Sequence, residues 1–222
     1  LFPKRIVLTN DDGIDAPGIR ALQALIGPRA VLVAPSGPRS GGSHYVTMNQ
    51  PIRVERRAEG EYAVDGTPGD CVRLAIKEFV PDVELILSGI NDGGNLGHDI
   101  YLSGTVAAAR EAAFHGVPAV ALSQYFRPDR AIDWAYTARL AGHALEAVLT
   151  RPLPAKSFWN INFPCAPDSP TPEVVFCEYS REPLPTHYEN GDNGFLYVKG
   201  RYHQRPSEPG SDVDVCFGGR IA

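Results

Sequence analysis

The 222-residue chain has few cysteines, no long hydrophobic run and no excess of positive charge. Its four cysteines make no Cys-x-x-Cys pair and have no histidine at zinc-ligand spacing, which argues against a disulfide framework or a zinc site. We therefore interpret them as reduced, mostly structural thiols. No apolar run approaches the roughly 18 residues of a membrane span, and no signal-peptide layout opens the chain. These absences predict a cytoplasmic protein without a membrane partner.

The charge balance narrows the possible ligands. The net charge is −5, which argues against a protein that binds a nucleic acid polymer by neutralising its phosphates. A small anionic substrate is compatible with this charge, because a metal ion reverses the local field of an acidic site. The length and the ordinary globular composition predict one large domain, or one domain with an appendage.

Short apolar runs alternate with helix-period segments through the first part of the chain. Continuous hydrophobicity indicates strands of a parallel sheet covered on both faces. Such runs occupy residues 5–9, 30–34, 85–88 and 117–123. Helical spacing predicts helices at residues 17–26, 68–80, 104–115 and 132–150. The expected N-terminal caps are Asp15, Thr67 and Ser103. This β-α alternation predicts a three-layer α/β/α, Rossmann-like fold with a mostly parallel, doubly wound sheet.

The pattern changes after residue 150. Six prolines between residues 152 and 172 interrupt two strand-like runs, 157–163 and 174–179. A polar stretch at 189–194 then leads into the strand-like run 195–199. We expect residues 1–150 to form the α/β core. We expect residues 151–222 to add C-terminal strands and an extended β-hairpin arm to the same domain, with the arm packing on another subunit.

Two adjacent carboxylates, Asp11 and Asp12, follow the first predicted strand, at the sheet edge where doubly wound folds bind ligands. A turn that begins at Asn10 can direct both carboxylates toward one cavity. Hard oxygen ligands of this kind suit Mg²⁺ or Mn²⁺, with water filling the other coordination positions. The alternative is a plain turn in which Asn10 and Asp11 cap the following helix.

Two glycine-rich loops follow other predicted strands. Ser40 lies in the loop 39–44, where glycines let backbone N–H groups approach a ligand. In the loop 88–97, Asn91 could supply a carbonyl oxygen to a metal and Asn95 an amide donor to a phosphoryl oxygen. A surface turn and a glycine-rich turn with Asx caps are the respective alternatives.

The start of a predicted helix supplies the fourth feature, Ser103-Gly104-Thr105. Exposed N–H groups, two hydroxyls and the positive end of the helix dipole suit a phosphate group. A simple N-cap explains Ser103 alone. All four features follow strands, so we expect them to face the same edge of the sheet.

Taken together, these segments closely resemble the SurE family, the stationary-phase survival proteins that act as 5′-nucleotidases. The similarity spans nearly the whole chain and weakens after about residue 165. It is specific because separate motifs occur in the right order: TNDDGIDAPG (9–18), APSGPRSGGSH (34–44), DGTPGDCV (65–72), SGINDGGNLGHDIYLSGTVAAAREAAFHGVPAVALS (88–123) and NINFP (160–164).

The resemblance implies roles for particular residues. The positions that match the family's ligands for one divalent ion, Mg²⁺ or Mn²⁺, are Asp11, Asp12, Ser40 and Asn91. The positions that match its phosphate contacts are Asn95, Ser103, Gly104 and Thr105. The resemblance also implies hydrolysis of nucleoside monophosphates, with tolerance of 3′-phosphates and short polyphosphates. It further implies a homodimer or homotetramer assembled through the C-terminal arm. Tyr45 departs from the family, where a small hydroxyl residue is common.

We hypothesise in-line attack on the phosphoester by a metal-activated water, with Asp11 and Asp12 as the catalytic carboxylates and Asp12 preferred as proton acceptor. A covalent aspartyl-phosphate route is the mechanistic alternative. A receiver-like signalling module is a different class of function, although Gly89 and Gln124 begin the loops where its phosphoacceptor aspartate is expected. A nucleotide-binding protein without turnover is the third.

Overall fold

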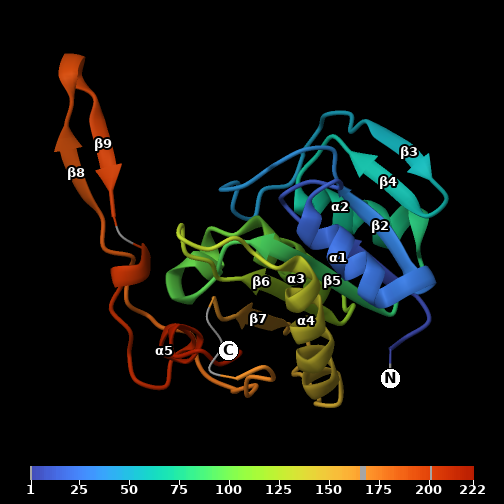
Figure 1. Ribbon diagram of the computed structural model, residues 1–222. Coiled ribbons are helices and arrows are strands. Elements are labelled where there is room, and N and C mark those ends of the chain that lie inside the picture. The colour runs from blue at the N-terminus through green and yellow to red at the C-terminus, as the bar shows by residue number, and fades with distance from the viewer. Residues whose placement is uncertain (1, 166–168, 201) are drawn as a thin grey trace.

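A computed structural model describes residues 2–165, 169–200 and 202–222. Seven strands form its main sheet: β1 (Ile6–Thr9), β2 (Ala30–Pro35), β3 (Val54–Ala58), β4 (Glu61–Val64), β5 (Leu85–Asp92), β6 (Ala119–Gln124) and β7 (Trp159–Phe163). Their order is β3-β4-β2-β1-β5-β6-β7 (Figure 1). Neighbouring strands are parallel, except that the edge strand β3 runs antiparallel to β4.

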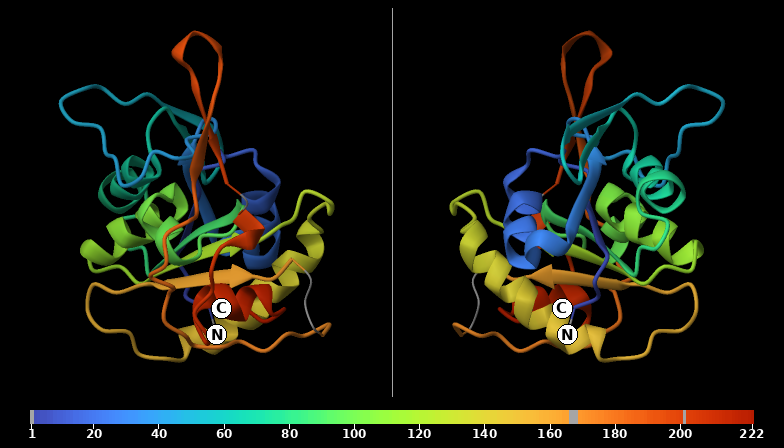
Figure 2. Two further views of the ribbon diagram at one scale, coloured as in Figure 1. Left: turned by 90° about the vertical axis from the view of Figure 1, so that its left-hand side faces the viewer. Right: turned by 90° about the vertical axis from the view of Figure 1, so that its right-hand side faces the viewer.

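Two pairs of helices cover the two faces of the sheet. α1 (Pro17–Ile26) and α4 (Trp134–Leu149) pack on one face, and α2 (Pro68–Leu74) and α3 (Gly104–Phe114) on the other (Figures 1 and 2). Successive strand residues point to opposite faces. In β1, Ile6 and Leu8 therefore join the core under α1 and α4, whereas Val7 joins the core under α2 and α3. The predicted three-layer α/β/α fold is confirmed.

The strand order reverses beside β1. The chain runs from β1 outward to β2 and β4, and β5 then returns to the other side of β1 before β6 and β7 continue outward. Doubly wound sheets bind ligands outside the carboxyl ends of their strands at such a reversal. Asp11 and Asp12 follow β1, and Asn91 and Asp92 end β5. The fold thus brings two of the predicted loops to the position where a ligand site is expected.

The helix caps agree with the sequence in two of three cases. The Thr67 hydroxyl accepts the Asp70 N–H in a capping box, and the Ser103 hydroxyl accepts the Val106 N–H. The prediction for Asp15 is wrong, because Ala16 occupies the cap position of α1 without a side-chain hydrogen bond. The exposed Asp15 carboxylate instead pairs with Arg57 and Arg20, which draws the side chain away from the helix start.

Two helical predictions need correction in length. The predicted helix 68–80 is α-helical only to Leu74 and continues as a π-helical turn, η2 (Ala75–Phe79). The predicted helix 132–150 begins at Trp134, where the Asp133 carboxylate accepts the Tyr136 N–H. Among the described residues, no helix combines the length and the hydrophobicity needed to cross a membrane.

The C-terminal segment is less regular than the core. The predicted strand over 157–163 is present as β7. The strand predicted over 174–179 is wrong, since only Val174 of that run pairs, with Ile221. A short helix, α5 (Asp212–Phe217), was not predicted, and it lies near β7. The backbone of Ala222 exchanges two hydrogen bonds with Asn162 of β7.

The predicted β-hairpin is present. β8 (His187–Asn190) pairs with β9 (Leu196–Lys199) around the turn η4 (Asp192–Gly194). All the residues of both strands are exposed. Figures 1 and 2 show the hairpin projecting from the body of the protein. An isolated two-stranded hairpin is marginally stable in water, so this element lacks the support that the main sheet gives its strands.

Candidate active site

The turn after β1 is closed by Asn10. Its side-chain Nδ2 donates to the Gly13 carbonyl at 2.8 Å, and its Oδ1 accepts the Gly13 N–H at 3.2 Å. Gly13 has a φ of 105°, and a Cβ there would lie 3.1 Å from the backbone of Gly37. The alternative in which Asn10 and Asp11 cap the following helix is wrong for both residues. The Asn10 side chain closes the turn at Gly13, the Asp11 carboxylate turns toward α3, and α1 has no side-chain cap.

Asp11 is 4% exposed and packs against the start of α3. Its Oδ1 accepts the Thr105 hydroxyl, and its carboxylate also accepts the Gly104 N–H. A Cβ on Gly104 would lie 2.8 Å from the Asp11 Cβ and 2.9 Å from its Oδ2, so only glycine admits the carboxylate this close. Burial raises the pKa of Asp11, opposed by these hydrogen bonds.

Asp12 points into the same site from the neighbouring position. Its Oδ2 accepts the Asp92 N–H at 3.1 Å, which leaves Oδ1 available. Burial and the charge of Asp11 raise the pKa of Asp12 to about 6. Burial also raises the pKa of Asp92. Among the described residues, no Lys or Arg offsets the charges of Asp11 and Asp12, so the pair would gain from a bound cation.

The loop that carries Ser40 is tied to the rest of the site at both ends. Its Arg39 N–H donates to the Asp11 carbonyl at 2.7 Å. At the other end, the Ser43 hydroxyl donates to the Tyr101 carbonyl at 2.8 Å, and the His44 Nε2 lies 2.8 Å from Glu111 of α3. These contacts hold Ser40 at the rim of the site, where its side chain is exposed.

Asn91 and Asn95 are both fixed by hydrogen bonds. Asn91 donates its Nδ2 to the Gly93 carbonyl at 2.7 Å, so its Oδ1 is the atom that it can offer to a ligand. Asn95 is 6% exposed and donates its Nδ2 to the Ser123 hydroxyl at 2.8 Å. The Asn95 backbone is held by Asn160 and Asn162 of β7. One N–H of the Asn95 amide group stays available.

Ser103, Gly104 and Thr105, at the start of α3, make different contacts. Ser103 caps the helix and lines the site at 7% exposure. Gly104 and Thr105 both contact Asp11, and Thr105 is fully buried. The structure therefore brings Asn95 and Ser103 to the site surface, and it places the Thr105 side chain behind Asp11.

A cavity of about 240 Å³ joins these groups at the carboxyl ends of β1 and β5. Six of the eight predicted site residues line it, and Gly104 and Thr105 lie behind. Two further carboxylates on its wall, Asp92 and Asp99, were missed by the sequence reasoning. Asp92 could have been found from the sequence, since it follows Asn91 at the end of a strand. No local pattern points to Asp99, whose cationic partner Arg205, at 2.6 Å, is distant in the sequence.

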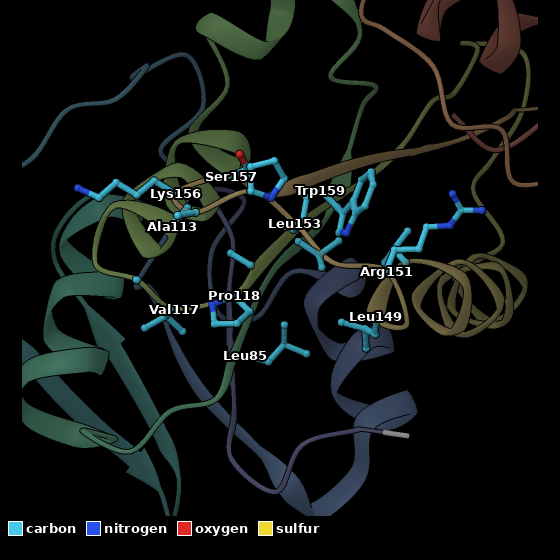
Figure 3. A pocket seen from close by; sticks show the side chains of 16 residues that line it. Leu85, Ala113, Val117, Pro118, Leu149, Arg151, Leu153, Lys156, Ser157 and Trp159 are labelled. Atoms are coloured by element: carbon cyan, nitrogen blue, oxygen red, sulfur yellow. The ribbon is translucent and has the colours of Figure 1, made fainter.

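A larger cavity, of about 470 Å³, lies at the amino ends of β5, β6 and β7 (Figure 3). Its walls are mostly apolar, with Leu85, Val117 and Leu149 around it. Figure 3 shows its two cationic side chains, Arg151 and Lys156, at opposite ends. The Arg151 guanidinium already lies 3.7 Å above the Phe176 ring centre. This cavity is at the edge of the sheet opposite to the carboxylates, so we locate the chemistry in the smaller one.

The donor atoms in the smaller cavity suit a hard divalent ion. Within the described ranges, no three or more His, Cys, Asp or Glu side chains are arranged to hold a metal. The predicted ligand set does not require such a group, since two of its four members are a hydroxyl and an amide oxygen. Two carboxylates with neutral oxygens and room for water are the surroundings that Mg²⁺ and Mn²⁺ prefer. The residues present therefore fit such an ion.

The fold and this site define a doubly wound α/β protein with an acidic cavity at the strand-order reversal, beside a helix start suited to anions. Residues 6–184 match the family model described as Survival protein SurE. The chain belongs to the SurE family.

Curated relatives and a solved structure agree with this assignment. The chain is 51% identical to a putative 5′-nucleotidase of Synechocystis sp., over 97% of this chain and 96% of that protein. It is 39% identical to the 5′-nucleotidase SurE of Myxococcus xanthus, over 97% of this chain and 84% of that protein. The crystal structure of the SurE protein from Aquifex aeolicus superposes with a TM-score of 0.87 at 30% identity, over 98% of this chain and 90% of that one.

Proposed function

We propose that this chain is a divalent-metal-dependent 5′-nucleotidase, a phosphomonoesterase that hydrolyses nucleoside monophosphates. The observation that carries the proposal is the cavity itself, in which the paired carboxylates of Asp11 and Asp12 share a wall with Ser103 at the start of α3. The first group attracts a cation and the second an anion, which is the combination that phosphoryl transfer needs. The relatives described above are named 5′-nucleotidases, which supports a nucleotide as substrate.

Asp11, Asp12, Ser40 and Asn91 are the residues that would hold one Mg²⁺ or Mn²⁺ ion. All four line the cavity. When bound, such an ion supplies charge neutralisation for the phosphoryl group and activation of the attacking water. Thr105 and Gly104 orient the Asp11 carboxylate, because both donate hydrogen bonds to it.

The phosphate group would lie between Asn95 and the start of α3. The Asn95 amide keeps one N–H for a phosphoryl oxygen, while Ser123 of β6 holds its side chain and β7 holds its backbone. Ser103 lines the same cavity at the positive end of the α3 dipole. Rigid placement of donors is the main contribution a protein makes to this reaction.

Asp12 is the better candidate for accepting the proton of the attacking water. Asp11 already receives two hydrogen bonds from Gly104 and Thr105. Asp12 receives one, from the Asp92 N–H, and its Oδ1 is free to face the reacting water. A proton acceptor must be within hydrogen-bond reach of the group that it deprotonates.

The test is a phosphatase screen of AMP, GMP, CMP and UMP against Mg²⁺, Mn²⁺ and Ca²⁺, with EDTA controls. The screen also includes 3′-AMP and tripolyphosphate. We expect metal-dependent release of phosphate that EDTA abolishes. Asp11→Asn and Asp12→Asn should each lower kcat by at least about 100-fold. Asp15→Asn is the matched control, since this exposed carboxylate points away from the cavity.

Two results would contradict the proposal. One is full activity in both Asp11→Asn and Asp12→Asn under saturating metal. The other is tight nucleotide binding without any phosphate release under every metal, which would favour a binding protein without turnover.

We also propose that the enzyme is a cytoplasmic homodimer or homotetramer assembled through the hairpin β8–β9. The hairpin exposes apolar side chains that no other part of the described structure covers: Tyr188, Phe195, Leu196, Tyr197 and Val198, each between 57% and 64% exposed. Exposed apolar clusters of this kind mark interaction surfaces. A second copy of the chain supplies the partner that the hairpin lacks.

A further inference from the structure

The larger cavity, at the amino ends of β5, β6 and β7, has the layout of a site for an amphipathic molecule. Its floor is apolar and closed to solvent, since Leu85, Val120 and Val148 are each at most 2% exposed. Its rim is exposed and carries two charged side chains, Arg151 and Lys156 (Figure 3). A ligand whose apolar part lies on this floor therefore has its polar end at the rim, in contact with water.

The two loops that wall this cavity hold their shape without a ligand. In the turn after α3, the Gly116 N–H donates to the Ala113 carbonyl at 3.0 Å. In the connection from α4 to β7, the Ser157 N–H donates to the Pro154 carbonyl at 3.1 Å. A Cβ on Gly116 would meet no atom within 4 Å, so the space beside this turn is open. A preformed cavity favours binding, because few groups must be ordered when the ligand enters.

The charges around the cavity select an anion. Within the described part of the chain, its lining residues include two cations and no Asp or Glu. This distinguishes it from the molecule as a whole, whose net charge is −5. The Arg151 guanidinium is already engaged, since it lies 3.7 Å above the Phe176 ring centre. The Lys156 ammonium, on a flexible stem, is therefore the group that can approach the charged end of a ligand.

The apolar walls fit an alkyl chain better than a flat ring. The sides are formed by aliphatic residues such as Val117, Leu149 and Leu153, and Trp159 is the one aromatic residue among the described lining residues. The volume of about 470 Å³ holds roughly fifteen atoms, at about 30 Å³ for each atom of the size of a water molecule. Decanoate falls within this limit.

We propose that this cavity is a binding site for a medium-chain fatty acid in its carboxylate form. The alkyl chain lies on the floor formed by β5, β6 and α4, and the carboxylate lies at the rim beside Lys156. The site is at the edge of the sheet opposite to Asp11 and Asp12. It is therefore separate from the acidic cavity, and the inference does not depend on the proposed phosphatase function.

The first experiment measures the binding of fatty acids of increasing length by isothermal titration calorimetry, each below its critical micelle concentration. From hexanoate to decanoate, the affinity should rise about fourfold for each added methylene. Tetradecanoate should gain nothing further, because the cavity is then full. Absence of binding for every acid would overturn the proposal. So would an affinity that rises steadily through tetradecanoate, since this is expected of non-specific binding to exposed apolar surface.

The two tryptophans of the chain locate the ligand. Trp159 lines the cavity, whereas Trp134 begins α4 and lies near Gly18 of α1. The probe is 10-bromodecanoate, whose bromine quenches a nearby indole. It should quench the fluorescence of Trp134→Phe, which keeps Trp159, and leave that of Trp159→Phe unchanged. Equal quenching of both variants, or of neither, would contradict binding in this cavity.

Substitutions test the apolar and the charged part of the site separately. Val117→Phe and Leu153→Phe each place a ring in the cavity, from opposite walls, and each should weaken decanoate binding by about tenfold, the effect of losing one to two methylene contacts. Lys156→Gln should weaken it by about threefold, as expected for an exposed ion pair. Lys77→Gln, at an exposed position of η2, is the matched control. Thermal unfolding followed by circular dichroism verifies that each variant is folded.

Three results with these variants would overturn the proposal. The first is an unchanged decanoate affinity in both folded phenylalanine variants. The second is a change in their oligomeric mass by light scattering, because the cavity would then be a contact between subunits. The third is equal binding of decanoate and decanol by the wild type together with unchanged decanoate binding in Lys156→Gln, because the site would then not select an anion.

Discussion

The α/β core and the C-terminal segment hold their side chains in place by different means. The core buries continuous apolar strands between two helical layers. The segment after residue 150 adds β7 to the main sheet. Beyond β7, the described residues form only a small buried apolar cluster between this segment and the core: Leu96, Tyr125, Val213 and Cys216. It is attached instead by single charged groups that reach the loop between β5 and α3.

Two carboxylates take part in these attachments. Asp212 of α5 accepts the N–H groups of Gly97 at 2.7 Å and Ser180 at 2.8 Å. Asp99 accepts from Arg205 at 2.6 Å and from Tyr202 at 2.7 Å. The C-terminal segment therefore supports the same loop that carries Asn95. The C-terminal segment has a weak hydrophobic pattern but still supports this loop, because a few buried polar contacts take the place of apolar packing.

Removal of the Arg205 side chain should have the largest effect on this attachment. The Arg205 side chain is 1% exposed, and Arg205→Ala leaves the Asp99 carboxylate without its cation. We expect a loss of about 3–5 kcal/mol in the free energy of unfolding, the usual effect of breaking a buried pair. Urea denaturation measures it, with the exposed Arg127→Ala as control. A loss below about 1 kcal/mol would show that the segment is an appendage and not a part of the domain.

Gly104→Ala should test the tight packing of the site in the α/β core. The new Cβ would meet Asp11 atoms at 2.8–3.1 Å and displace its carboxylate. A displacement of this order lowers phosphatase kcat by about 100-fold. Gly37→Ala is the matched control, since a Cβ there meets no atom within 4 Å. Unchanged kcat in Gly104→Ala would mean that the position of Asp11 does not limit the reaction.

The same contrast explains what could be predicted from the sequence. Local patterns predict the strands β1, β2, β5, β6 and β7 and the caps Thr67 and Ser103, because burial on both faces and capping geometry each constrain neighbouring residues. The hairpin β3–β4 was missed, since the edge strand β3 is mostly charged and exposed and has no apolar pattern.

Some residues of the candidate site can likewise be predicted from local motifs, and others cannot. Asp11, Asp12, Ser40 and Asn91 could be named because each follows a strand in a local motif. Asp99 could not, because its partner Arg205 is 106 residues away in the chain. The contact of Thr105 with Asp11 could not be predicted from the sequence either. A hydroxyl at a helix start suggests a ligand contact as readily as a contact to another loop.

A third prediction concerns the attachment of the Ser40 loop to the core. Glu111 is 4% exposed and accepts hydrogen bonds from Arg73 at 2.6 Å and His44 at 2.8 Å. Burial alone would raise the pKa of Glu111, but these two partners hold it below its ordinary value of 4.5. A lowered folded-state pKa means that the ionised carboxylate stabilises the fold above that ordinary value, and that this stability is lost as the pH falls through the folded-state pKa.

Glu111→Gln should therefore lower the free energy of unfolding by about 1.5–3 kcal/mol at pH 7. The difference from the wild type should shrink below about pH 4. Denaturation curves at several pH values measure this, with the exposed Glu146→Gln of α4 as control. A difference that stays constant from pH 7 to pH 3.5 would show that the charge of Glu111 does not hold the loop.

The smallest effect on the single chain is expected in the hairpin. Leu196→Ser and Val198→Ser together replace two side chains that are 61% and 64% exposed, so the stability of an isolated subunit should change by less than about 0.5 kcal/mol. The oligomeric state should change strongly, because the same substitutions remove apolar surface from the proposed interface. Light scattering during size-exclusion chromatography measures it, with Met48→Ser, at 65% exposure outside the hairpin, as control. If the double variant keeps the mass of the wild type at micromolar concentration, assembly through this hairpin is wrong. The C-terminal segment would then act only through its contacts to the loop between β5 and α3.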